Sequence, residues 1–150
     1  MADRRIPASA AGLVLAAMAA GPAAGADGKA LYAEICQACH QEGGKGALGV
    51  APPVASRLVK AAARQAKDYV PLVLLNGLNG AIEIEGQTFQ SVMPAQAHLS
   101  DADLAAVATY VYGVLNGERG AKVDAKAVAA LRATPKSAPE LLDLRKRISP

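Results

Sequence analysis

One short motif in the sequence combines residue types that could do chemistry, Cys36-Gln37-Ala38-Cys39-His40. Two cysteines three residues apart near the end of a helix present their sulfurs on the same side, and a histidine follows directly. This C-x-x-C-H spacing is typical of covalent haem attachment, in which each thiol forms a thioether with a haem vinyl group. We therefore predict one haem c attached at Cys36 and Cys39, with His40 as the proximal ligand of the iron.

Other interpretations of the cysteine pair stay open, including a chance match. The pair could be a disulfide or a thioredoxin-like redox site. That site requires a strand before the motif and a parallel α/β sheet, whereas residues 28–35 are typical of a helix. A structural zinc site needs four ligands. Residues 27–150 contain only these two cysteines and two histidines, and His98 lies 59 residues after Cys39.

The iron needs a sixth ligand or an open site, and the candidates are Met93, His98 and a lysine. Met93 lies in a turn-rich segment, and the following Pro94 restrains the backbone beside it. A lone methionine is more often core filler than a ligand, but Met93 is the only methionine after residue 26. Haem held by His and Met is typical of electron transfer. We predict Met93 as the distal ligand and His98 as a surface histidine.

With these residues the chain resembles the class I cytochrome c family of small monohaem electron carriers. The resemblance covers about residues 27–116. Cys36, Cys39 and His40 match the haem-binding motif, and Met93-Pro94 matches the distal-ligand loop. Four further positions match the first and last helices of the family, which cross each other: Gly28, Tyr32, Val107 and Tyr110.

The resemblance implies an all-α cytochrome c fold of three to five helices around one covalently bound haem. A small hairpin before the distal methionine is compatible with it. It also implies that the carbonyl of Pro52 accepts the ring N–H of His40 and so fixes its tautomer and orientation. The implied function is electron transfer between redox partner proteins rather than catalysis, with a periplasmic dehydrogenase as donor or a terminal oxidase or reductase as acceptor. The alternative is a haem enzyme or gas sensor whose sixth site opens.

Residues 1–26 have the pattern of a secretory signal peptide. Arg4 and Arg5 precede an apolar run over residues 10–20, and Ala24-Gly25-Ala26 supplies a small-x-small cleavage site. A run of this length is too short to span a bilayer, which takes about 20 residues. We expect cleavage after Ala26 and a periplasmic protein with no transmembrane segment, and an uncleaved anchor is the alternative.

Local signals predict the elements of the domain that follows, residues 27–116. Asp27 is placed to cap a helix that runs to about Cys36, and residues 41–53 read as a loop. An alanine-rich basic segment, residues 55–67, precedes a short apolar helix over residues 69–78. Alternating residues 82–85 followed by a turn favour a hairpin. Ser100 caps the last helix of the domain, which carries one apolar stripe.

The basic extension, residues 117–150, has a net charge of +4, from 8 Lys+Arg and 4 Asp+Glu, against −2 for residues 27–116. We predict a short helix over residues 124–133 and a second one after Ser137, which has capping-box spacing to Glu140. The extension either folds back onto the body, which we favour, or forms a docking arm for a partner. The basic residues are spread out and lack interleaved aromatics, which argues against nucleic-acid binding.

The composition contains few large side chains for a core. Apolar residues make up 52% of the chain, but 35 residues are alanine and only 3% are aromatic. Alanine buries little area, so a buried porphyrin would supply the large flat apolar body that aromatic side chains otherwise provide. Small residues such as Ala38, Ala55 and Ala95 would then let the chain approach it closely.

The chain without haem should therefore be mostly unfolded, because it lacks its largest core component. Circular dichroism of the apoprotein should show much less helix than the haem-loaded protein. A well-folded apoprotein would contradict this account of the composition.

Overall fold

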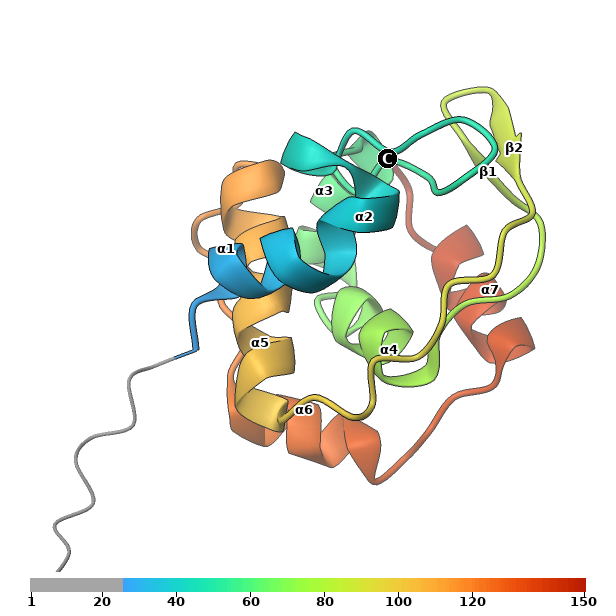
Figure 1. Ribbon diagram of the computed structural model, residues 1–150. Helices are drawn as coiled ribbons and strands as arrows, with labels where there is room; N and C mark the ends of the chain where they lie inside the picture. Colours follow the sequence, from blue (N-terminus) through green and yellow to red (C-terminus); the bar gives the residue numbers. More distant parts are fainter. Residues whose placement is uncertain (1–25) are drawn as a thin grey trace, which may run out of the picture.

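Helices make up most of the structure, a computed structural model that describes residues 26–150 (Figure 1). The predicted signal peptide lies outside the described residues except for Ala26. No described helix is long and apolar enough to cross a bilayer. Besides the single 3₁₀ turn η2 (Glu42–Gly44), four helical runs belong to residues 27–116 and two to the extension, so the body agrees with the expected all-α fold of three to five helices.

The first helical run carries the haem motif at its C-terminal end. It consists of α1 (Gly28–Leu31), the π-helical segment η1 (Tyr32–Cys36) and α2 (Gln37–His40), in direct succession. The Asp27 carboxylate caps its start, accepting hydrogen bonds from the backbone N–H groups of residues 29 and 30 at 2.9 and 3.2 Å. The expected end near Cys36 was wrong by four residues. The helix ends only where Gln41 takes a left-handed conformation with φ 61°.

The first helix crosses the last helix of the body, α5 (Asp101–Tyr110), at a glycine. A Cβ atom on Gly28 would lie 2.1 Å from the Ala106 carbonyl oxygen, so only glycine permits this approach. The rings of Tyr32 and Tyr110 pack beside the crossing with centroids 5.4 Å apart. Ser100 caps α5, as predicted, and the π-helical segment η3 (Val111–Leu115) continues it.

Two further helices, α3 (Arg57–Gln65) and α4 (Tyr69–Asn76), follow the first helical run in the chain, and α4 packs against both α5 and the extension. Tyr112 is fully buried and fixes the turn between α3 and α4. Its hydroxyl donates to the Lys67 carbonyl oxygen at 3.0 Å and accepts from the Val70 N–H at 3.1 Å.

The predicted hairpin is present as β1 (Ile82–Ile84) and β2 (Gln87–Phe89), antiparallel with Ile82 opposite Phe89. Residues 85 and 86 connect the strands with φ of 51° and 80°, the left-handed turn that a two-residue hairpin favours. Ile84 and Phe89 are buried, which anchors the hairpin to the body.

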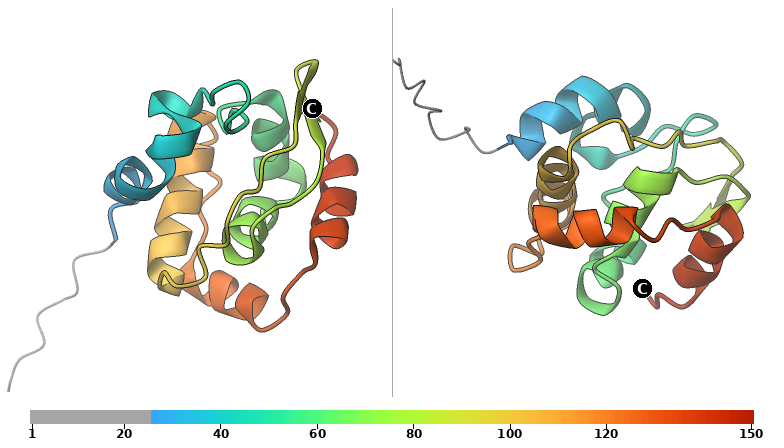
Figure 2. Two further views of the ribbon diagram at one scale, coloured as in Figure 1. Left: turned by 45° about the vertical axis from the view of Figure 1, so that its right-hand side comes forward. Right: turned by 90° about the horizontal axis from the view of Figure 1, so that it is seen from below.

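The extension folds back onto the body, as the favoured interpretation expected (Figure 2). Its two helices are α6 (Ala125–Arg132), which contacts α4 and α5, and α7 (Ala138–Lys146), which contacts α4. The predicted pairing of Ser137 and Glu140 starts α7: the Glu140 carboxylate accepts from the Ser137 N–H and hydroxyl at 2.8 and 2.7 Å.

Gly28→Ala should destabilise the protein by about 1–3 kcal/mol or more, because the new methyl group would separate α1 from α5. Denaturant unfolding of the haem-loaded protein, followed by circular dichroism, measures the change. Gly113→Ala is the matched control, since a Cβ there would meet no atom closer than 3.8 Å. It should be neutral or stabilise the helix by up to about 1 kcal/mol. Equal effects of the two substitutions would contradict the packing account of the crossing.

Candidate functional site

An apolar cavity lies between the first helical run, α4, α5, the hairpin and α7. Cys36, Cys39, His40, Pro52 and Met93 all line it, so the structure brings together every site residue that the sequence singled out. Most of the remaining wall is aliphatic or aromatic: Ile35, Val50, Pro53, Val54, Val59, Val70, Val73, Leu74, Leu78, Ile82, Ile84, Phe89, Val92, Val107 and Val111.

The two cysteines lie at the cavity edge with free thiols; Cys36 is half-buried and Cys39 is exposed. Burial, with a smaller contribution from Cys39, raises the pKa of Cys36 to about 11. A thioredoxin-like nucleophilic cysteine needs a lowered pKa. The surroundings of Cys36 therefore disfavour the redox-pair alternative.

His40 is buried, with 7% of its surface exposed, and its ring is held by the backbone. Its Nδ1 lies 2.9 Å from the Pro52 carbonyl oxygen. Because a carbonyl can only accept, Nδ1 carries the proton and Nε2 keeps its lone pair. Burial lowers the pKa of His40, and the opposing effect of the Pro52 hydrogen bond is smaller. The imidazole is thus neutral with a free nitrogen, which is the form that binds a metal.

The loop between His40 and Pro52 is short and tightly folded. The Gly46 N–H donates to the His40 carbonyl oxygen at 2.8 Å, and the Val54 and Ala55 N–H groups both donate to the Gly44 carbonyl oxygen at 2.9 Å. These bonds fix the Pro52 carbonyl against the His40 ring.

Met93 is partly buried in the loop between β2 and α5, and its backbone is fixed on both sides. Met93 and Leu78 exchange two backbone hydrogen bonds, of 2.9 and 3.0 Å, and the Gln96 N–H donates to the Leu74 carbonyl oxygen at 2.7 Å. Arg132 of α6 continues this support, donating to the carbonyl oxygens of residues 97 and 99 at 2.6 and 2.9 Å. The extension therefore helps to hold the loop that carries Met93.

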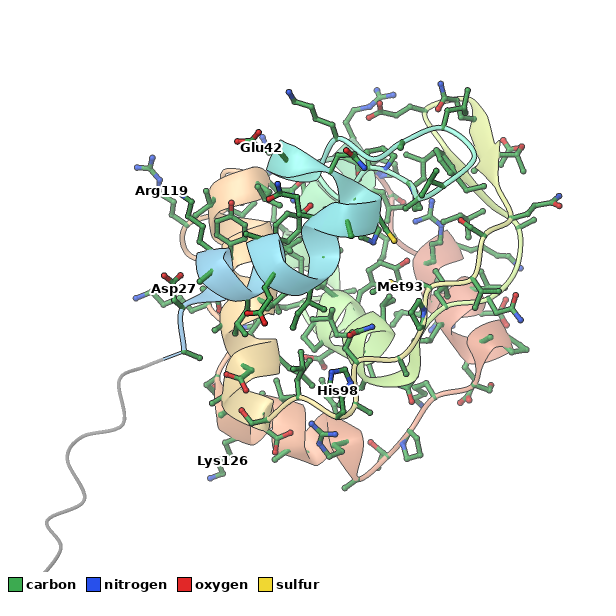
Figure 3. All side chains as sticks on the ribbon, in the orientation of Figure 1. Asp27, Glu42, Met93, His98, Arg119 and Lys126 are labelled. Carbon is green, nitrogen blue, oxygen red and sulfur yellow. The ribbon has the colours of Figure 1, made fainter. Side chains whose placement is uncertain are left out.

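The alternative sixth ligands lie elsewhere. His98 is exposed at the start of α5 and does not line the cavity (Figure 3). No lysine lines the cavity within the described part of the chain. Within residues 26–150, no three His, Cys, Asp or Glu side chains are grouped so that they could hold a metal ion.

Arg145 and Tyr69 also line the cavity, and neither was among the site residues expected from the sequence. Arg145 is four residues after Leu141 and three before Ile148, both of which are buried. It therefore lies on the apolar stripe of its helix, and this spacing is the signal that could have identified it.

The residues present fit a haem. The wall suits a large flat apolar group, two thiols at the edge can form thioethers, and a neutral imidazole and a methionine sulfur are available as iron ligands.

Gly46→Ala should weaken the support of His40. A Cβ on Gly46 would lie 2.5–2.7 Å from atoms of residues 51–53, whereas a Cβ on Gly49 would meet nothing within 4 Å. Both glycines have φ near 70°, at 69° and 76°, so both alanine variants carry the left-handed cost of about 1 kcal/mol. Only Gly46→Ala should lower the free energy of unfolding by a further 1–3 kcal/mol or so. Denaturant unfolding of the haem-loaded protein measures this difference. Equal losses of stability in Gly46→Ala and Gly49→Ala would show that the position of the Pro52 carbonyl does not depend on the close packing of Gly46 against residues 51–53.

Comparison with known proteins agrees with this geometry. Residues 25–114 match the Cytochrome c family. The chain is 36% identical over 128 residues to cytochrome c-552 of Thermus thermophilus, an alignment that covers 82% of this chain and 97% of the relative. It is equally similar to a second cytochrome c-552 of Thermus thermophilus, of which 86% is covered. The chain therefore belongs to the cytochrome c family of electron-transfer proteins, which carry covalently bound haem c.

Proposed function

We propose that this protein is an exported one-electron carrier whose haem c is attached at Cys36 and Cys39 and ligated by His40 and Met93. The observation that carries the proposal is that these four side chains line one aliphatic cavity although they come from two distant segments of the chain. The haem supplies a one-electron Fe(III)/Fe(II) couple, and the protein supplies its attachment, ligands and surroundings.

The roles that His40 and Met93 would have as iron ligands follow from the contacts that hold each of them. His40 would bind the iron through Nε2, because Nδ1 is bonded to the Pro52 carbonyl. Met93 would bind through its sulfur from a loop whose backbone is fixed by Leu78. Ligands held by backbone contacts on both sides shift little between the two oxidation states, and this keeps the cost of electron transfer low.

An electron carrier accounts for the cavity better than a haem enzyme or gas sensor does. If His40 and Met93 both bind the iron, a substrate could reach it only after Met93 dissociates. A peroxidase also requires acid–base groups over the iron, and His98, the one candidate that the sequence offered, lies outside the cavity wall.

Contact with redox partners would take place at the cavity rim. Val50 and Val92 line the cavity and are 50% and 64% exposed, and Cys39, which also lines it, is exposed as well, so the rim of the cavity reaches the surface. The partners fitting this role are a periplasmic dehydrogenase as donor or a terminal oxidase or reductase as acceptor. Export to the periplasm would follow cleavage of the predicted signal peptide after Ala26.

Met93→Leu should open the iron site and lower the reduction potential, on the order of 0.1 V, because methionine ligation raises it. The wild-type haem should be low-spin and should not bind carbon monoxide, whereas Met93→Leu should bind it readily. Optical spectra of the reduced protein with and without carbon monoxide test both expectations.

His98→Leu is the control, and it should leave the spectrum and the potential unchanged. If His98→Leu altered the spectrum and Met93→Leu did not, the assignment of Met93 as the distal ligand would be contradicted. Acid-acetone extraction tests the attachment separately, since haem held by two thioethers stays with the protein.

A further inference from the structure

The cavity wall contains one buried cation, Arg145 of α7. It is 7% exposed, and its Nη2 donates to the Glu83 carbonyl oxygen of β1 at 2.6 Å. A guanidinium has five N–H donors in a planar fork; this bond uses one of them, and the neighbouring Tyr69 hydroxyl engages another. The fork therefore has donors to spare at the cavity wall.

No side chain of the described residues supplies the charge that Arg145 needs. The four ion pairs among residues 26–150 use Arg64, Arg132, Lys136 and Lys146 as cations, and no aspartate or glutamate lines the cavity. A guanidinium removed from water without an anion is strongly unfavourable. A ligand that carries a negative charge into the cavity would therefore neutralise the buried guanidinium.

The other titratable groups facing Arg145 do not supply it. Besides Arg145, those lining the cavity are Tyr32, Cys36, Cys39, His40 and Tyr69. On the elements packed against α7, the carboxylates are Asp68 at the start of α4, and Glu83 on β1, whose side chain accepts from Thr88. Both are exposed.

The helix that carries Arg145 lies on the side of the molecule towards which the acidic groups of a haem would point. The two vinyl groups of a haem are on one half of the ring and the two propionates on the other half. Attachment at Cys36 and Cys39 therefore directs the propionates away from α2. In all three views α7 lies on the other side of the molecule from α2 (Figures 1 and 2).

We propose that Arg145 binds a haem propionate through its guanidinium, with the Tyr69 hydroxyl as a second donor, so that the C-terminal extension completes the haem site. This inference rests on the proposed attachment of haem at Cys36 and Cys39. Arginine pairs with carboxylates through two parallel hydrogen bonds, and the planar fork at the cavity wall suits a propionate.

Tyr69 is placed to assist. It is 5% exposed and lines the same cavity. Burial raises the pKa of Tyr69, and the charge and hydrogen bonding of Arg145 oppose this rise, because the guanidinium lies beside the hydroxyl. The hydroxyl is therefore protonated and able to donate.

The paired guanidinium keeps the propionate ionised. A carboxyl group buried without a counterion has a raised pKa, and an adjacent cation lowers it again. The reduction potential should consequently vary little with pH, because no proton accompanies the electron at this propionate.

Arg145→Gln in the haem-loaded protein tests this role. At about pH 8, losing the positive charge should raise the ferric-to-ferrous ratio at a fixed applied potential by roughly tenfold, or about 59 mV. As the pH falls towards about 5, the unpaired propionate should take up a proton, more readily in the ferrous state, and the potential should rise back towards that of the wild type. Potentiometric titration at several pH values measures both effects.

Two matched variants control for charge and for structure. Arg147→Gln removes the same charge from an exposed site next to α7 and should leave the pH dependence unchanged. Arg145→Lys keeps the charge at the buried site and should stay close to the wild type. An Arg145→Gln protein that is less stable but has the wild-type pH dependence would overturn the proposal, leaving Arg145 only its bond to Glu83.

The wild type offers a test that needs no variant. Proton NMR of the haem-loaded protein follows the two propionates separately, and at least one should keep its chemical shift between about pH 5 and pH 8. Titration of both propionates in that range would overturn the proposal. Haem lost on acid-acetone extraction of the wild type would instead contradict the attachment at Cys36 and Cys39, so the two failures are distinguishable.

Discussion

The arrangement of the elements depends on one constraint: the centre of the protein is a cavity, and the chain must hold its walls apart as well as together. A compact side-chain core would pull these walls inward. The crossing of α1 and α5 at Gly28 sets the position of the helix that carries the haem motif. The two backbones are so close there that a Cβ on Gly28 would lie 2.1 Å from the Ala106 carbonyl oxygen. The two backbone hydrogen bonds between Met93 and Leu78 fix the loop on the opposite side of the cavity. The two proposed iron ligands, His40 and Met93, are thus positioned by backbone contacts more than by the packing of their own side chains.

The extension contributes through burial more than through its charge. Val128, Leu141 and Ile148 are nearly fully buried, and each such side chain is worth about 1.5–3 kcal/mol. The two ion pairs that join the extension to the body, Arg64 with Glu118 and Arg132 with Asp101, are partly exposed, and ion pairs open to solvent contribute at most about 1 kcal/mol. The opposite net charges of body and extension therefore account for little of the fold-back, and the apolar stripes account for most of it.

Features encoded by neighbouring residues could be predicted from the sequence, and features set by distant contacts could not. The caps at Asp27, Ser100 and Ser137 and the hairpin turn depend on residues within four positions, and the structure contains all of them. The continuation of the first helix to His40 could not be read locally, because no residue between 37 and 40 breaks or requires a helix. The spacing of Arg145 to Leu141 and Ile148 indicates only that its side chain faces inward; its place in the cavity wall depends on how α7 docks, which no local pattern specifies.

The shortage of aromatic residues has a different structural consequence from the one expected. Ala38, Ala55 and Ala95 do not line the cavity; valine, leucine, isoleucine and proline line most of it. The most buried alanines, Ala62 and Ala108, lie instead in the core cluster among the helices. Small residues there let helices approach closely, as Gly28 does against α5, and this leaves the longer aliphatic side chains free to face inward. The alanines therefore allow the helices around the cavity to pack closely, and the arrangement of these helices shapes the apolar wall that a haem requires.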